Sequence, residues 1–284
     1  MILRCLFAAL LLLVAPALAQ TKLKTAATFS VLGDLVRQVG GDRIDVAVLV
    51  GPDTDTHTYQ PTPADARALA GAKVLVSNGL GFEGWLERLA EAASFKGRSI
   101  VASRGAAPGP DPHCWQDVAC TRRYVANITA GLAEIDPANA SFYRLRASAY
   151  DAQLFALDTW IRSEIARVPA GKRKVITNHT SFGHFARAYG VEFSAARGAT
   201  MGSEPSARDL ANLIRQAREQ KIKALFVENL GNPALVAEIA RDSGATVGPP
   251  LYSDALSRAD GPAPTYEAMM RYNVSALVAG MLKN

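Results

Sequence analysis

Residues 136–168 read DPANASFYRLRASAYDAQLFALDTWIRSEIARV, and the organisation of the whole chain depends on them. Asp136 and Pro137 suit the cap and the first position of a helix. Apolar side chains then recur at steps of three and four residues, which predicts a helix. These side chains are Phe142, Leu145, Ala149, Ala152, Phe155, Ala156, Trp160 and Ile161. Because Pro169 and Gly171 end the pattern, the helix would be roughly 45–50 Å long.

This helix lies in the middle of the chain, with segments of similar length on either side. Both flanking segments alternate short apolar runs with amphipathic stretches, which is the pattern of an α/β fold. We therefore expect two lobes, each a mainly parallel sheet flanked by helices, at residues 20–135 and 170–284. The connecting helix, residues 136–169, would join them, with the ligand cleft between the lobes. A long core helix inside a single domain is the alternative.

Short apolar runs mark the strands of the two expected sheets. They are residues 24–29, 44–50, 74–77 and 99–102 in the first lobe, and 174–177, 192–194 and 224–228 in the second. The run at 44–50 is nearly continuous, which is typical of a strand buried on both faces. Ligands of such sheets bind outside the carboxyl ends of the strands, so the loops after these strands are candidate binding segments.

The first 19 residues have the features of a signal peptide. Arg4 supplies a positive start, Leu6 to Val14 form a short apolar run, and Ala17 to Ala19 form a small-residue cleavage signal. We expect cleavage after about Ala19 and a periplasmic mature protein. No later stretch approaches 18 uncharged apolar residues, so we expect no membrane span.

Cysteine usage fits an exported protein. Once Cys5 is removed with the signal peptide, Cys114 and Cys120 remain. An even number of cysteines in an oxidising compartment predicts a disulfide between them. A pair of metal-binding thiolates is the alternative.

The charged residues argue against a nucleic-acid partner. The net charge is +5, but the basic residues are scattered and are not interleaved with aromatic side chains. A mildly basic, solvated surface accounts for this composition.

Three histidines and one aspartate occupy similar positions, in polar loops that follow apolar runs. They are His57 in DTHTYQP, His113 in DPHCW, His179 in TNHTS and Asp254 in LYSD. Three imidazoles and one carboxylate make a complete tetrahedral set for Zn²⁺, whereas Mn²⁺ prefers more oxygen ligands. Two of the four precede the long helix and two follow it, so one bound ion would tie the lobes together. Each residue taken alone could instead be a turn or capping residue.

His184 is the remaining histidine, and we exclude it from this set. It follows His179 by five residues inside an expected helix, which turns it about 140° away from the direction of His179. A partly buried helix residue is the simpler interpretation.

On these residues the chain resembles the metal-binding solute receptors of ABC importers, the zinc and manganese group with a long linking helix. The likeness extends over nearly the whole mature chain. The matching segments are HTYQP at 57–61, GLGFEGWLERL at 79–89, DPHCW at 111–115, NHTSFGHFARAYG at 178–190 and LYSD at 251–254. The resemblance implies that His57, His113, His179 and Asp254 are the metal ligands.

The resemblance also implies a function. The chain would be a high-affinity receptor, without enzyme activity, that captures Zn²⁺ in the periplasm and delivers it to the membrane permease of an ABC importer. Manganese members more often have a carboxylate where His179 stands, which favours zinc. Zinc members often carry a long His- and acid-rich loop near the first ligand, whereas residues 51–56 contain only Asp53 and Asp55. A zinc-donating carrier protein is a further potential partner, and we expect a monomer.

Four protein ligands leave no open coordination position, which suits binding rather than catalysis. Affinity should fall below about pH 6, because ligation requires neutral imidazoles. Release would require one ligand loop, such as that of Asp254, to swing away at the permease.

Other functions stay open at this point. A manganese receptor of the same family is one alternative. A zinc hydrolase is another, and it would need an open coordination position with Glu228 or Asp254 as the general base. An adhesin or a zinc buffer could use the same scaffold.

Overall fold

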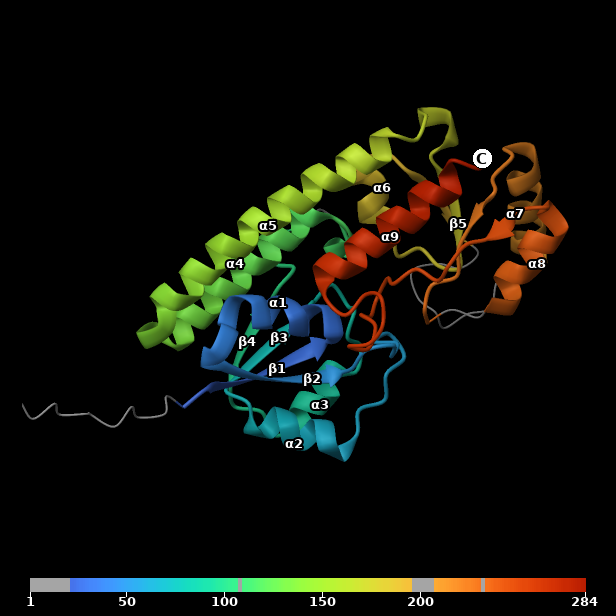
Figure 1. The fold of residues 1–284 in the computed structure, drawn as a ribbon. Coiled ribbons are helices and arrows are strands. Elements are labelled where there is room, and N and C mark those ends of the chain that lie inside the picture. The colour runs from blue at the N-terminus through green and yellow to red at the C-terminus, as the bar shows by residue number, and fades with distance from the viewer. Residues whose placement is uncertain (1–20, 107–108, 196–206, 231–232) are drawn as a thin grey trace, which may run out of the picture.

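Two parallel sheets form the centres of two lobes in the computed structural model, which describes residues 21–106, 109–195, 207–230 and 233–284 (Figure 1). The first sheet has the order β2-β1-β3-β4 and contains β1 (Leu23–Phe29), β2 (Ile44–Val50), β3 (Val74–Ser77) and β4 (Arg98–Val101). The second has the order β6-β5-β7-β8 and contains β5 (Lys174–Thr177), β6 (Glu192–Ala195), β7 (Ala224–Leu225) and β8 (Thr246–Val247). The expected α/β fold is therefore confirmed.

Helices connect the strands and lie against the sheets. The shorter ones are α1 (Ser30–Gly40), α2 (Pro63–Gly71) and α3 (Leu86–Ala92) in the first lobe, and α6 (Gly183–Tyr189), α7 (Ala207–Glu219) and α8 (Pro233–Ser243) in the second. The longer ones are α4 (Val118–Ile135), α5 (Ala140–Ala166) and α9 (Tyr266–Met281). Figure 1 shows α5 extending along the molecule from one lobe to the other, as expected of a connecting helix. None of the described helices is long and apolar enough to cross a bilayer.

The start of the connecting helix differs from the prediction. Asp136 does not cap α5, because a 3₁₀ turn, Pro137–Asn139, comes first. The Asp136 carboxylate instead accepts hydrogen bonds from Asn139 Nδ2 at 2.8 Å and from Tyr143 Oη at 2.6 Å. The acidic residue thus fastens the turn to the first part of the helix.

The buried face of α5 is also not the predicted one. The side chains that face the protein are Tyr143, Ala147, Tyr150, Leu154, Leu157, Ile161 and Ile165. Of the predicted stripe, Ile161 is fully buried, whereas Leu145 and Phe155 are 72% and 60% exposed. Arginine side chains stack over the aromatic rings of the outer face: Arg43 and Arg146 over Phe142, Arg122 over Phe155, and Arg271 over Trp160. Guanidinium groups thus partly cover apolar surface that the core does not use.

Strand β2 is an edge strand, which corrects the expectation that it is buried on both faces. Its neighbour β1 occupies the interior of the sheet, between β2 and β3. Asp45 and Ala47 of β2 are accordingly exposed, and only its two ends are buried. Apolar composition alone did not distinguish an edge strand from a central one.

The hydrophobic core is shared between the lobes. One large cluster of buried side chains extends from the first sheet through α4, α5 and α9 to α6 and part of the second sheet. A smaller cluster comes from β5, α7, β7 and α8, and it contains Ile176, Leu213, Ala217, Ile222, Leu225 and Ile239. The lobes are therefore joined by packing as well as by the connecting helix.

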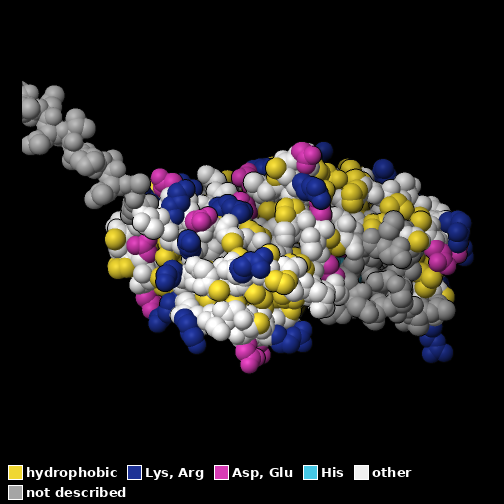
Figure 2. Space-filling view, turned by 90° about the horizontal axis from the view of Figure 1, so that it is seen from below, with side chains coloured by type: hydrophobic (Ala, Val, Ile, Leu, Met, Phe, Trp, Pro, Cys, Tyr) yellow, Lys and Arg dark blue, Asp and Glu magenta, His cyan; other side chains and the backbone are white. Residues whose placement is uncertain are grey.

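The surface mixes charges of both signs. Figure 2, seen from below, shows Lys and Arg side chains interspersed with Asp and Glu on this face, with apolar side chains gathered between them.

The predicted signal peptide, residues 1–19, and its cleavage site after Ala19 lie outside the described residues.

Candidate metal centre

The four predicted ligands come from four separate loops. His57 lies between β2 and α2, His113 lies between β4 and α4, and His179 directly follows β5. Asp254 follows Leu251, which makes an isolated parallel bridge to Glu228 just beyond β7. These loops leave the carboxyl ends of parallel strands or of their continuations, which is where α/β sheets place ligands.

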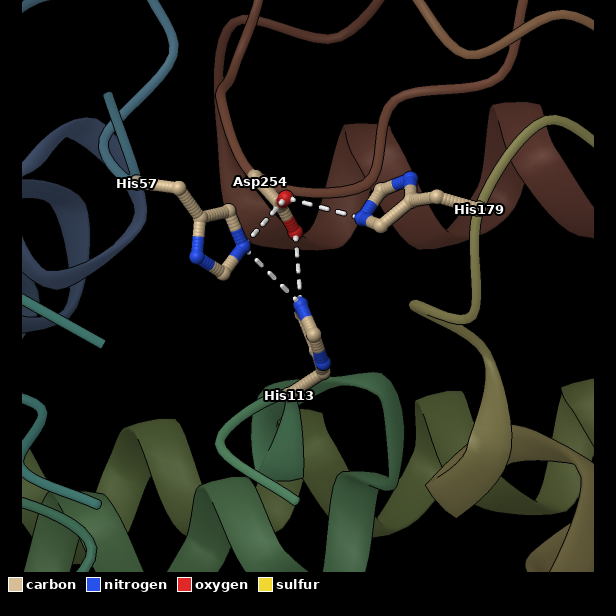
Figure 3. Close-up of side chains that lie close together, drawn as sticks. All are labelled: His57, His113, His179 and Asp254. Atoms are coloured by element: carbon tan, nitrogen blue, oxygen red, sulfur yellow. Dashed lines mark hydrogen bonds and ion pairs between the residues drawn. The ribbon is translucent and has the colours of Figure 1, made fainter. Parts of the chain in front are cut away.

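The structure brings all four side chains together (Figure 3). His57 Nε2 lies 3.3 Å from His113 Nε2 and 3.3 Å from Asp254 Oδ2. His179 Nε2 is 3.3 Å from Asp254 Oδ2, and His113 Nε2 is 3.6 Å from Asp254 Oδ1. One donor atom from each residue lies within 4.8 Å of the other three. Each imidazole thus presents Nε2 to a common point.

The donor atoms are sheltered from solvent. His113, His179 and Asp254 are almost fully buried, and His57 is the most exposed, with 7% of its side chain accessible. Within the described residues, neither Asp254 oxygen nor His179 Nε2 has an aligned hydrogen-bond partner. Buried polar atoms without partners are unfavourable, so a cation among them would satisfy what the protein leaves unpaired.

The electrostatics of the centre suit a cation. Burial by itself lowers the pKa of His179, but the carboxylates of Glu228 and Asp254 outweigh burial and raise this pKa to about 11. Burial opposes the charged form of Asp254, whereas His113, His179 and His57 hold its pKa well below the usual range. These shifts favour an ionised carboxylate next to a protonated imidazole when no metal is bound, and a divalent ion would replace the proton.

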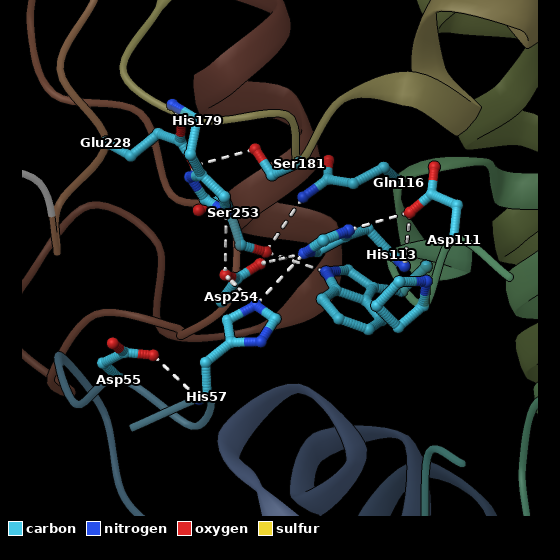
Figure 4. Close-up of polar contacts among 12 residues, drawn as sticks. Asp55, His57, Asp111, His113, Gln116, His179, Ser181, Glu228, Ser253 and Asp254 are labelled. Carbon is cyan, nitrogen blue, oxygen red and sulfur yellow. Dashed lines mark hydrogen bonds and ion pairs between the residues drawn. The ribbon is translucent and has the colours of Figure 1, made fainter. Parts of the chain in front are cut away.

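Two further carboxylates contact the far sides of the imidazoles (Figure 4). Asp111 Oδ1 lies 2.8 Å from His113 Nδ1 and also accepts the backbone N–H of His113 at 3.1 Å. Glu228 Oε2 lies 2.8 Å from His179 Nδ1 as an ion pair, and Ser181 Oγ donates to the same oxygen at 2.7 Å. A carboxylate at Nδ1 favours the tautomer that leaves Nε2 free to bind metal.

Sequence reasoning did not assign these two roles. Asp111 belongs to the DPHCW motif, and its position two residues before His113 was an available signal. Glu228 lies 49 residues from His179, and a separation of that length gives no sign in the sequence that the two side chains are in contact.

The loop that carries Asp254 is fastened to the first lobe. Ser253 O accepts hydrogen bonds from Trp115 Nε1 at 2.7 Å and Gln116 Nε2 at 2.9 Å. Leu256 donates its backbone N–H to Ser30 Oγ at 2.9 Å, and Leu256 O accepts the N–H of Asp53 at 3.1 Å. These bonds argue against the expectation that this loop swings away on release.

His184 lies outside the set of three Nε2 atoms and one carboxylate. It is a buried residue of α6, and its Nε2 is 3.1 Å from the backbone oxygen of Asp111. Cys114 and Cys120 lie beside it.

The predicted disulfide is confirmed. It joins Cys114 to Cys120, with 5.7 Å between their Cα atoms. Cys114 follows His113 directly and Cys120 lies in the first turn of α4, so the bond ties the His113 loop to that helix. A disulfide offers no thiolates, which removes the alternative of a cysteine metal site.

Known proteins resemble this chain over most of its length. The family model described as zinc-uptake complex component A, periplasmic, matches residues 26–280. The manganese-binding lipoprotein MntA of Halalkalibacterium halodurans is 31% identical over 91% of this chain and 88% of its own. The iron-binding protein YfeA of Yersinia pestis is 29% identical over 91% of this chain and 86% of its own.

A solved structure gives the same result. The periplasmic zinc binding protein TroA of Treponema pallidum superimposes with a TM-score of 0.87 at 26% identity, covering 92% of this chain and 99% of TroA. The family model matches most of the chain, MntA is 31% identical to it, and TroA has the same fold. This chain therefore belongs to the ZnuA family, the metal-binding solute-binding proteins of ABC importers.

Proposed function

We propose that the chain is a high-affinity zinc receptor that binds one Zn²⁺ through His57, His113, His179 and Asp254 and delivers it to the permease of an ABC importer. The convergence of three Nε2 atoms and one carboxylate on one buried point carries this proposal. Four protein ligands form a closed tetrahedral set, which retains an ion and leaves no open position for an activated water. Family members are substrate-binding proteins of transporters rather than enzymes, so the hydrolase alternative is withdrawn.

The choice of metal rests on the donor chemistry. Imidazole nitrogens suit Zn²⁺, whereas Mn²⁺ favours sites dominated by carboxylate and water oxygens. Relatives that are named for manganese and iron keep a manganese receptor as the second candidate. The single carboxylate among the four donors is the observation that favours zinc.

The receptor would work in the periplasm, together with a membrane permease. Residues 1–19 would direct export and be removed after about Ala19, and a disulfide is typical of an oxidising compartment such as the periplasm. The mature chain would comprise lobes 20–135 and 170–284 and the connecting helix 136–169. It would act as a monomer that meets the permease and, where one exists, a zinc-donating carrier protein.

The hydrogen bonds around the ligands indicate which ligand loop would move first when the metal is released. Asp254 shares its anchored loop with Ser253, and His113 is fastened by Asp111 and the disulfide. His57 is the most exposed of the four and has no carboxylate at Nδ1 among the described residues. We therefore expect release to begin with the loop of His57 rather than that of Asp254.

Metal titrations of the purified mature protein test the function. We expect one equivalent of Zn²⁺ to bind, in preference to Mn²⁺ when both compete with a chromophoric chelator. His179→Ala and Asp254→Ala should each weaken binding by at least about 100-fold, since one of four ligands is lost. Asp42→Ala, at an exposed aspartate of the first lobe paired with Arg43, is the control and should bind zinc like the native protein. Preferential Mn²⁺ binding would establish the second candidate instead.

A further inference from the structure

The loop between β3 and α3, residues 78–85, has an unusual backbone. Gly79, Leu80 and Gly81 have successive φ values of 86°, 56° and 76°. A left-handed conformation is natural for glycine but strained for leucine. The Leu80 side chain is also 41% exposed, so burial of its apolar surface does not explain the strain. Strained, exposed residues of this kind are concentrated at functional sites.

The inner side of this loop is rigidly held. The buried carboxylate of Glu83 accepts the backbone N–H of Asn78 at 2.6 Å and that of Gly79 at 3.1 Å. Thr28 Oγ1 donates to the same carboxylate at 2.6 Å. These bonds determine the conformation in which Leu80 projects, so its exposure is a built feature of the loop.

The same loop supports two of the candidate ligand loops. Asn78 Nδ2 donates to Pro112 O at 3.0 Å, directly before His113. Trp85 Nε1 donates to Thr56 O at 2.8 Å, directly before His57. The ring of Phe82 lies edge-on to His57, with 4.7 Å between centroids. Displacing this loop from outside would therefore displace His57.

Gly84 is a second exposed residue of the same loop. Its φ lies outside the left-handed region, and a Cβ built on it would meet no atom within 4 Å. Neither its backbone conformation nor its neighbours require glycine, and the residue is exposed. A larger side chain therefore fits at Gly84 in the isolated chain and would obstruct a partner that packs against the loop.

We propose that the loop 78–85 is a docking surface for the permease of the importer, with Leu80 entering an apolar pocket of the permease. This inference rests on the proposed function. A partner is required for release rather than for capture, because buried ligands retain the ion unless they are displaced. Pressure on the loop reaches His57 through Phe82, and His57 is the ligand at which release would begin.

The test uses two variants of the loop and two matched controls in the full mature chain. Leu80→Asn removes the apolar side chain and keeps a residue that tolerates positive φ, and Gly84→Gln fills the open space. Leu145→Asn alters an exposed leucine of α5, and Gly71→Gln alters a glycine at the end of α2 that also has open space around it. Zinc affinity is measured on purified proteins, and zinc uptake is measured in cells that carry each variant in place of the native protein.

We expect both loop variants to bind Zn²⁺ within about twofold of the native affinity and to reduce uptake roughly tenfold, as expected for a truncated interface hot spot. Both controls should support normal uptake. If Leu80→Asn fails to fold, Leu80→Gly removes the side chain and relieves the strain, and it should give the same uptake defect.

Native-like uptake by both loop variants would overturn the docking proposal. Normal uptake combined with slow loading from a zinc-donating carrier would also overturn it, and would assign the loop to that carrier. A defect shared by the controls would likewise contradict a specific surface. Absence of zinc binding by the native protein would contradict the proposed function itself, which is a distinguishable result.

Discussion

At the scale of single residues, three histidines and one aspartate were identified because chemistry and position coincide. Each lies in a polar loop after an apolar run, and parallel sheets bring such loops to one edge. The group behind His179 depends on a long-range contact, so Glu228 could be placed there only from the structure. Asp111 lies two residues before His113, and its place behind that histidine could have been suspected from the sequence.

Removing the charge behind His179 should weaken metal binding. Glu228→Gln keeps the size of the side chain but removes its charge. The carboxylate of Glu228 holds the proton of His179 on Nδ1, which leaves Nε2 free to bind metal. We expect the zinc dissociation constant to rise by about 10–100-fold in a chelator competition. Glu134→Gln, an exposed carboxylate on α4 paired with Arg98, is the control. Equal affinities for the two variants would show that Glu228 does not orient His179.

Zinc binding should release a proton. The pKa of His179 is raised to about 11 in the metal-free protein, so this imidazole is protonated at neutral pH and must become neutral to ligate. About one proton per Zn²⁺ should then be released at pH 7. Zinc affinity should therefore continue to rise as the pH is raised above 6, and not only over the range below pH 6. Calorimetry in two buffers of different ionisation enthalpy measures this number. A binding enthalpy that is the same in both buffers would contradict the protonated state of His179.

At the scale of helices and strands, element type and order were predicted well, and orientation was predicted poorly. The long helix carries two apolar stripes, and its composition did not indicate which one is buried. Tyr143 and Tyr150 occupy the buried face although they are amphipathic, whereas Phe155 points outward beneath Arg122. Strand β2 shows the same limit, because a strand's place in the sheet order is a property of the assembled fold.

The disulfide should stabilise the His113 loop. Cys114→Ser with Cys120→Ser removes a crosslink across six residues, which we expect to destabilise the protein by about 2 kcal/mol. Thermal unfolding should then start several degrees lower, and zinc affinity should weaken because the loop before α4 becomes less ordered. Differential scanning calorimetry and zinc titration measure the two effects. An unchanged zinc affinity would limit the role of the disulfide to stability.

At the scale of the whole molecule, the two-lobe α/β fold and the central helix followed from the pattern of apolar runs. The sharing of one core by both lobes did not, because it depends on where α9 returns. Tyr266 at the start of α9 donates its backbone N–H to Asp34 and its hydroxyl to Trp115 O, which are contacts with the first lobe. The segment of Asp254, assigned by sequence to the second lobe, is consequently attached to the first.

Metal removal should lower the stability of the whole chain. A ligand that binds only the folded state at about 1,000 times its dissociation constant stabilises that state by roughly 4 kcal/mol. For a chain of this size we expect a melting temperature about 10 °C lower after chelation. The shift should fall to about a third or less in His179→Ala, because a site weakened about 100-fold is then only about tenfold above its dissociation constant at the same zinc concentration. A full shift in that variant would place the ion elsewhere.

The late position of Asp254 and α9 in the chain has a consequence for biosynthesis. A nascent polypeptide that ends before residue 254 lacks one of the four candidate donors and the helix that completes the shared core. The set of four candidate donors is therefore complete only when translation is nearly over. A chain made in this order would have no complete set of donors for a divalent ion while it is being synthesised, and the set would be complete only after its last segment has folded.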